Sequence, residues 1–346
     1  MFKYIAIKNE LKKIIDSHDA HYMLPSRNEI IREYKVSDIT VRKALEELLR
    51  EGLIYSHHGK GSFVAPKKKE FLEVYNIMQG TEQRHFKDKS GWYFPLVEEL
   101  EMALEENEME MTISFHKKKA DMERQILERL MNKSPYGIII YYSGHKENIP
   151  YYKNLLEINR NCVFVDRYIE EINSNYVGTD NILTAKLLAE NISKSKSDKT
   201  YIIDFDWCNK TNVSIERQTG FIQGIDNKNY EIITTKKSYY DELDSVCDYI
   251  ERDIKKYDNI GMLTMNSYML SDIYSKIGNI LMDRKVLNIG CFEKPDISLF
   301  DNTNLFWARQ NIEQIAKSTV KIIKENKKDM EHILIPADII FEKSEK

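Results

Sequence analysis

The chain has 346 residues, and its 51 Lys and Arg against 55 Asp and Glu give a formal net charge of −4. This length predicts two or three domains, and 42% hydrophobic with 31% charged residues excludes a disordered chain. The charge of the whole chain argues against a nucleic-acid-binding protein. Residues 1–69, however, carry 14 Lys and Arg against 9 Asp and Glu, and the remainder carries 37 against 46. A basic segment of +5 therefore precedes an acidic one of −9.

The compartment is predicted from the apolar runs and the cysteines. No apolar run reaches the roughly 18 residues that a membrane helix needs. The N-terminus has charges spread through it and no small-residue cleavage site, which is unlike a signal peptide. The cysteines, Cys162, Cys208, Cys247 and Cys291, are widely spaced and form no C-x-x-C pair. We therefore expect a cytoplasmic protein without a disulfide framework, a metal or a cofactor.

The first 65 residues are expected to form three helices followed by a hairpin. The predicted elements are helices over 5–15, 27–34 and 38–51 and strands over 53–56 and 62–65. Ser26 and Ser37 are candidate N-caps, and Leu49 is placed on the buried face of the third helix. A glycine-containing turn joins the strands. This pattern predicts a winged helix-turn-helix, whose third helix enters the major groove of DNA.

The candidate DNA contacts lie at the starts of the second and third helices and at the tip of the hairpin. They are Ser26, Arg27, Ser37, Asp38, Thr40, Arg42, Lys43, His58, Gly59, Lys60 and Gly61. Arg42 could pair with a phosphate or with a guanine, and Lys60 could reach a phosphate or the minor groove. Charged residues on a helix more often form a solvent-exposed face than a binding site. The order and spacing of the set are what favour DNA binding.

These residues resemble the DNA-binding domain of the GntR family over nearly all of residues 2–65. The matching runs are Leu24-Pro25-Ser26, Tyr34-Lys35-Val36-Ser37, Thr40-Val41-Arg42-Lys43-Ala44-Leu45, Glu51-Gly52-Leu53-Ile54 and Gly59-Lys60-Gly61-Ser62-Phe63-Val64. The resemblance implies a dimer that reads a two-fold operator. Two positions depart from the family, because Asn28 and Asp38 stand where it usually has arginine. An aspartate would repel phosphate but could accept from a cytosine amino group.

From residue 71 onward, strand patterns alternate with helical patterns. Strands are predicted over 71–78, 109–115, 136–142, 162–165, 199–205, 230–235, 259–264, 286–291 and 333–340. Helices are predicted over 95–107, 122–132, 181–192, 214–226, 240–256, 267–281 and 311–325. This alternation predicts a doubly wound parallel α/β architecture in two lobes. We expect domains at 1–66 and 71–346, joined by a lysine-rich linker at 67–70.

The second segment resembles the LacI/GalR sugar-sensing domain, which is itself similar to periplasmic binding proteins. The resemblance covers about residues 71–342. It rests on Val163-Phe164-Val165-Asp166-Arg167, Val177-Gly178-Thr179-Asp180-Asn181, Glu216-Arg217-Gln218-Thr219-Gly220-Phe221, Arg309-Gln310 and Ile335-Pro336-Ala337-Asp338-Ile339-Ile340. Carried over position by position, it implies effector contacts at Arg217, Asn266, Glu293 and Gln310.

Further effector contacts follow from residue type and position. The aromatic rings that could stack on the apolar face of a sugar are those of Trp92, Tyr93, Tyr142 and Trp207, although aromatic residues at strand ends are more often core. Arg167 either grips the effector or forms a structural ion pair with Asp166, and the sequence leaves both readings open. Arg217 is the strongest single candidate because a guanidinium can donate to two hydroxyls at once.

Together, these observations predict a ligand-responsive transcription regulator of the repressor type. It is expected to bind a palindromic operator and a small effector, for which a sugar is the first expectation. The fusion resembles arabinose-responsive regulators of the GntR family. We expect a homodimer formed through the first lobe, and no membrane. No arrangement of nucleophile and general base emerges, so an enzyme is not expected. Two alternatives stay open: a two-lobed carbohydrate-active enzyme, and a sugar-binding protein with an accessory basic domain.

Overall fold

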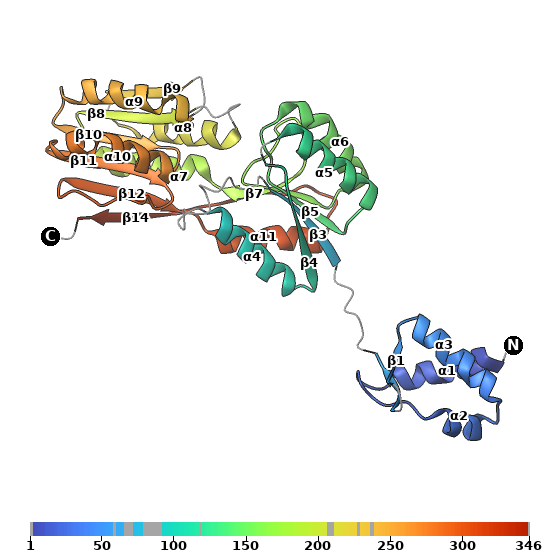
Figure 1. Ribbon diagram of the computed structural model, residues 1–346. Helices are drawn as coiled ribbons and strands as arrows, with labels where there is room; N and C mark the ends of the chain where they lie inside the picture. The colour runs from blue at the N-terminus through green and yellow to red at the C-terminus, as the bar shows by residue number, and fades with distance from the viewer. Residues whose placement is uncertain are drawn as a thin grey trace. The chain divides into compact units, whose positions relative to one another are not determined.

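The computed structural model describes residues 3–57, 60–65, 72–78, 92–117, 119–205, 211–226, 229–235 and 239–344. The chain divides into two compact units, Met1–Glu70 and Phe71–Lys346 (Figure 1). The predicted linker at 67–70 lies outside the described residues and stays a prediction. Among the helices that the structure describes, none is long and apolar enough to span a bilayer.

The N-terminal unit contains the predicted helices and hairpin. Its elements are α1 (Lys3–Asp16), α2 (Arg27–Tyr34), α3 (Asp38–Arg50), β1 (Ile54–His57) and β2 (Gly61–Val64). Both predicted N-caps are confirmed. The Ser26 hydroxyl accepts from the Glu29 N–H while the Glu29 carboxylate accepts from the Ser26 N–H, which is a capping box. The Ser37 hydroxyl accepts from the Thr40 N–H at the start of α3.

A small apolar core holds this unit together. Its fully buried members include Leu11, Ile30, Val41 and Leu48, from all three of these helices. Leu49 was predicted to be buried and is instead 39% exposed, so that prediction is wrong. One residue along a helix is a turn of about 100°, and this rotates Leu49 off the face that Leu48 buries.

The C-terminal unit is built on two sheets within the described residues. The first has the order β13-β7-β6-β5-β3-β4, with parallel pairing throughout. Its strands are β3 (Leu72–Met78), β4 (Met109–Phe115), β5 (Gly137–Ile140), β6 (Cys162–Val165), β7 (Asn175–Thr179) and β13 (His332–Ile335). We call this sheet and its helices the first lobe.

The second sheet has the order β14-β12-β11-β10-β8-β9, and its pairs are parallel except for β14 with β12. Its strands are β8 (Lys199–Phe205), β9 (Tyr230–Thr235), β10 (Asn259–Thr264), β11 (Val286–Phe292), β12 (Thr303–Arg309) and β14 (Asp338–Lys343). This sheet and its helices form the second lobe. The predicted two-lobed, doubly wound architecture is confirmed.

Helices cover both faces of the first sheet. The helices are α4 (Tyr93–Glu105), α5 (Ala120–Lys133), α6 (Ile149–Ile158) and α11 (Ile312–Glu325). Along β5, Ile139 belongs to the apolar cluster with α4 and α11, whereas Ile138 and Ile140 belong to the cluster with α5 and α6. Alternate side chains of a strand face opposite ways, so a strand covered on both faces is apolar throughout.

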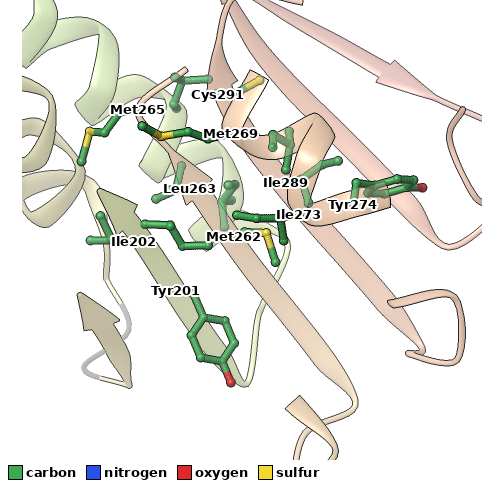
Figure 2. Close-up of a cluster of buried hydrophobic side chains, with 14 of the residues drawn as sticks. Tyr201, Ile202, Met262, Leu263, Met265, Met269, Ile273, Tyr274, Ile289 and Cys291 are labelled. Atoms are coloured by element: carbon green, nitrogen blue, oxygen red, sulfur yellow. The ribbon is translucent and has the colours of Figure 1, made fainter. Parts of the chain in front are cut away.

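The second lobe has one continuous apolar cluster, part of which Figure 2 shows around Ile202, Met262 and Ile289. Its helices are α7 (Asn181–Lys194), α8 (Asn212–Gly224), α9 (Tyr239–Ile254) and α10 (Ser267–Met282). Helices α7 and α8 pack closely because Gly220 and Gly224 face α7. A Cβ added at Gly220 would lie 2.3 Å from the Ile182 carbonyl oxygen.

In the described part of the chain, the backbone passes between the lobes three times. The crossings follow β7 at Asp180, β12 at Gln310 and β13 at Pro336. The last crossing corrects the predicted strand at 333–340. Proline lacks an N–H, and at this point the chain leaves the first sheet, so β13 and β14 are separate strands in different sheets.

Candidate functional site

The predicted site residues form two groups, one in each unit. The group in the N-terminal unit lies at the start of α3. The Arg42 guanidinium lies 3.3 Å from the Asp38 carboxylate, and their side chains are 59% and 50% exposed. The Ser37 and Thr40 hydroxyl oxygens are 2.8 Å apart. The Lys43 ammonium lies 4.2 Å above the ring of Tyr4. The structure therefore gathers these predicted contacts at the N-terminal end of the third helix.

A shallow groove lies between α3 and the hairpin. Its lining residues are Arg27, Arg42, Leu45, Glu46, Leu49, Ser56, His57, Gly61 and Ser62. Arg27, Arg42 and Gly61 were predicted DNA contacts, and the groove brings them together. Lys60 is exposed in the turn, with its N–H donating to the His57 carbonyl. The predicted contacts His58 and Gly59 lie outside the described residues.

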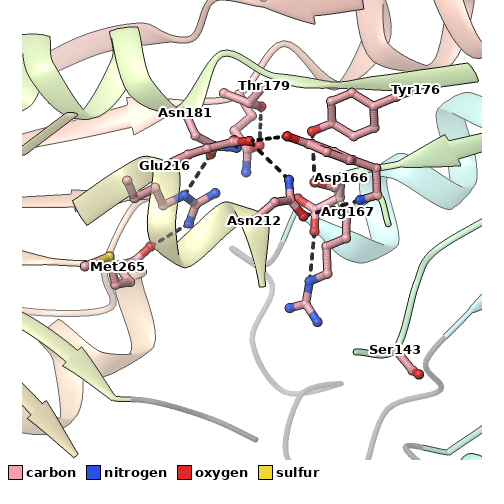
Figure 3. Close-up of polar contacts among 12 residues, drawn as sticks. Ser143, Asp166, Arg167, Tyr176, Thr179, Asn181, Asn212, Glu216 and Met265 are labelled. Atoms are coloured by element: carbon pink, nitrogen blue, oxygen red, sulfur yellow. Dashed lines mark hydrogen bonds and ion pairs between the residues drawn. The ribbon is translucent and has the colours of Figure 1, made fainter. Parts of the chain in front are cut away.

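The second group lies in the C-terminal unit, where strand ends and helix starts of both lobes meet (Figure 3). In open α/β sheets, ligands bind at the carboxyl ends of strands. Asp166 and Arg167 follow β6, Met265 and Asn266 follow β10, and Glu293 follows β11. The start of α8 adds Glu216 and Arg217.

Arg217 lies at the centre of this group and is only 7% exposed. Its Nε donates to the Asn181 Oδ1 at 2.9 Å, and its Nη1 donates to the Met265 carbonyl at 2.5 Å. The guanidinium carbon lies 3.6 Å from the centre of the Phe292 ring. Burial lowers the pKa of Arg217, and the nearby Asp166 and Glu293 carboxylates oppose that shift. A buried guanidinium near two carboxylates is suited to bind polar groups such as hydroxyls.

Asp166 and Arg167 form an ion pair, with Arg167 Nε 3.4 Å from the Asp166 Oδ2. The Arg167 guanidinium also lies 4.9 Å from the centre of the Tyr141 ring. Burial raises the pKa of Asp166, while Arg167 and Arg217 act against that shift. Both Asp166 and Glu293 have a φ of 66°, a left-handed conformation that costs free energy for a residue with a side chain. They follow β6 and β11, which occupy the same position in the two sheets.

Glu216 links the two lobes through hydrogen bonds. From the first lobe, the Tyr168 hydroxyl donates to Glu216 at 3.2 Å, and the Tyr168 N–H donates to the Asn212 Oδ1 at 3.3 Å. Asn181 and Asn212 also donate to the Glu216 carboxylate, at 3.1 and 3.4 Å. Burial, followed by the Glu216 charge, raises the pKa of Tyr168 to about 12. The sequence reading did not include this bridge, because its residues are 44 to 48 positions apart.

Gln310 and Asn266, both predicted from the LacI/GalR resemblance, are held by neighbours. The Gln310 Nε2 donates to the Glu293 Oε1 at 2.5 Å, and the Thr179 hydroxyl donates to the Gln310 Oε1. The Asn266 Oδ1 accepts from the Met269 N–H at 3.1 Å and so caps α10. The network thus joins Glu293 and Gln310 at the second crossing between the lobes.

The predicted aromatic contacts separate into different environments. Tyr93 packs edge-on against Tyr141 with ring centres 6.2 Å apart, and Trp92 lies 5.8 Å from Tyr141. Tyr142 lies in the apolar cluster under α5 and α6, edge-on to Tyr152, and its use as an effector contact stays a prediction. Trp207 lies outside the described residues. Tyr141 was missed, although its position next to Tyr142 places it on the opposite face.

The comparison with protein families decides the class of the N-terminal unit. Residues 3–64 match the model described as "Bacterial regulatory proteins, gntR family". The N-terminal unit is a GntR-family helix-turn-helix domain. The expectation drawn from its motifs is confirmed.

Curated relatives extend the similarity beyond the GntR domain. The "Arabinose metabolism transcriptional repressor" of Halalkalibacterium halodurans is 29% identical over 186 residues, which are 52% of this chain and 50% of that protein. The protein of the same name from Geobacillus stearothermophilus is 29% identical over 176 residues, 49% of this chain and 47% of that one. The chain therefore spans about half the length of these curated relatives. Both curated relatives are named as transcriptional repressors.

Solved structures show the fold of the C-terminal unit. The probable maltose operon repressor MalR of Staphylococcus aureus matches with a TM-score of 0.65 and 13% identity, over 80% of this chain and 98% of that one. The Cra regulator of Pseudomonas putida, solved in complex with fructose 1-phosphate, matches with a TM-score of 0.63 and 15% identity, over 78% of this chain and 98% of that one. The same fold occurs in solved structures described as a LacI transcriptional regulator and as a periplasmic binding protein/LacI transcriptional regulator, with TM-scores of 0.62 and 0.57.

Proposed function

We propose that the chain is a ligand-responsive transcription repressor. Its GntR domain binds a palindromic operator, and its two-lobed unit binds a small effector, a sugar or sugar derivative. The observation that carries this proposal is the joining, in one chain, of a GntR domain to a LacI-type unit whose strand ends converge on Arg217. It acts in the cytoplasm as a homodimer, so that two GntR domains meet the two halves of the operator.

The effector acts by favouring one arrangement of the lobes. Donors and acceptors from both lobes meet at the site, because Asp166 and Tyr168 belong to the first lobe and Glu216, Arg217 and Glu293 to the second. A sugar that hydrogen-bonds to both sides binds the closed arrangement more tightly than an open one. Only this difference in affinity can shift the equilibrium and so change operator binding.

A sugar fits the chemistry of this site. Guanidinium, amide and carboxylate groups suit hydroxyls, and Tyr141 and Tyr93 supply aromatic rings beside them. The names of the curated relatives point the same way, since both are arabinose metabolism repressors. Pentoses are therefore the first effectors to test.

The test combines ligand binding with DNA binding on the full chain. Pentoses, hexoses and their phosphates are screened by thermal shift, since a ligand that binds the folded state raises its apparent stability. Arg217→Gln is compared with Arg309→Gln, because Arg309 is an exposed arginine paired with Asp338 near the second crossing. We expect the active sugar to raise the melting temperature of the wild type and of R309Q, but not of R217Q.

Measuring DNA binding by R217Q distinguishes a variant that has lost only the effector site from one that no longer folds. R217Q should bind the same selected DNA as the wild type, yet fail to respond to the sugar. A normal sugar response in R217Q would remove Arg217 from the site. Absence of specific DNA binding by the wild type, or consumption of the sugar, would overturn the proposed function.

A further inference from the structure

An isoleucine is presented to solvent at the start of α3. Ile39 is the second residue of this helix and is 78% exposed, the largest exposure of any large hydrophobic side chain in the described part of the chain. A lone exposed apolar residue is common on protein surfaces, so exposure alone assigns it no role. Its position and its neighbours do.

The polar side chains around Ile39 bond to one another. Ser37 and Thr40 share a hydrogen bond across the cap, and Asp38 pairs with Arg42 one turn along the helix. These contacts leave the methyl groups of Ile39 projecting at the tip of the helix that enters DNA in this domain type. An exposed β-branched residue also contributes little to helix stability. Folding therefore gives no reason for an isoleucine here.

We propose that Ile39 contacts the 5-methyl group of a thymine in the operator and so determines specificity at that base pair. Thymine is the base that displays a methyl group in the major groove, and apolar side chains recognise it there. Side chains at the N-terminal end of the recognition helix reach base edges. This inference rests on the proposed function of the GntR domain. It adds Ile39, which was not among the candidate DNA contacts, as a residue that reads a base.

The test removes each side of the proposed contact separately: the thymine methyl group from the DNA and the Ile39 side chain from the protein. Full-length protein first selects its preferred duplex from a random-sequence pool, and each thymine of the selected site is then replaced by deoxyuridine, which lacks the methyl. We expect one replacement per half-site to weaken wild-type binding by about fourfold, the effect of losing one buried methyl. The same replacement should leave the affinity of Ile39→Ala unchanged, because the contact is already lost.

Ile158→Ala is the matched control, since Ile158 is a 56% exposed isoleucine in the C-terminal unit. It should keep the full deoxyuridine penalty. Because Ile39 is exposed, I39A should fold normally, which circular dichroism checks. If a site is selected but no deoxyuridine penalty depends on Ile39, the inference fails and the proposed function stands. If the wild type selects no sequence, the proposed function itself fails.

Discussion

Asp38 pairs with the arginine that is the leading candidate for a DNA contact. Its carboxylate lies 3.3 Å from the Arg42 guanidinium, and both groups are about half exposed. On DNA, Asp38 would therefore oppose Arg42 in two ways, by neutralising it and by repelling nearby phosphates.

We predict that Asp38→Ala tightens DNA binding by about three- to tenfold at low salt and steepens its salt dependence, because one more positive charge becomes available to phosphate. Fluorescence anisotropy across a salt series measures both effects. Asp244→Ala is the control, because it removes an exposed aspartate that pairs with Lys276 in the C-terminal unit. Weaker binding by D38A would show instead that Asp38 accepts from a cytosine.

The packing of α7 on α8 positions much of the candidate effector site. Asn212, Glu216 and Arg217 lie in the first turns of α8, and Gly220 follows on the face against α7. A side chain at Gly220 would meet backbone of α7, which cannot move aside as a flexible side chain can.

We predict that Gly220→Ala lowers the free energy of unfolding by about 2 kcal/mol or more, as overpacked cores do, and weakens the effector response by displacing Arg217. Gly278→Ala is the control in α10, where the nearest atom to an added Cβ is a Phe300 ring carbon at 3.4 Å. This second change should be neutral or stabilising by about 0.5–1 kcal/mol, because alanine favours a helix. Urea unfolding measures both, and equal losses would contradict the packing argument.

Periodicity predicted the elements where one pattern dominates, and it failed where the local signal was weak. The strands Met109–Phe115, Cys162–Val165 and Asn259–Thr264 were predicted with the observed bounds. The strands β7 and β12 were missed because their apolar runs are short: Gly178 follows Tyr176-Val177 in β7, and the polar Thr303 and Asn304 come before the apolar residues 305–308 in β12. Helix α6 was missed as well. Spacing along the chain carries no information about which lobe a strand joins, so β13 and β14 were merged.

The candidate site was predictable where a motif carried it. Arg217, Glu293 and Gln310 came from family motifs, and the structure brings them into one network. Tyr168 and Tyr141 carry no motif of their own, and they reach the site through strand order and side-chain alternation. Such contacts depend on the tertiary fold, which a single sequence does not display.

The bridge between Tyr168 and Glu216 favours the arrangement in which the lobes meet. We predict that Tyr168→Phe weakens effector binding by about three- to tenfold, because the loss of a hydrogen bond to a partly exposed carboxylate lowers the population of the binding-competent arrangement. Tyr249→Phe is the control, since its hydroxyl donates to Glu231 within the second lobe at 2.5 Å. Calorimetric titration compares them, and equal affinities would show that the bridge does not contribute to closure.

Because the chain crosses between the lobes, the order in which its parts can fold during synthesis differs from the order in which they begin. The first lobe receives α11 and β13 from residues 312–335, near the end of the chain, although it begins with β3. Its apolar cluster, which includes Ile315, Ile323 and Ile335, cannot close until synthesis has passed residue 335. The GntR domain needs only its first 65 residues for its own core. The N-terminal unit of a nascent chain can therefore be complete well before the first lobe of the C-terminal unit can close.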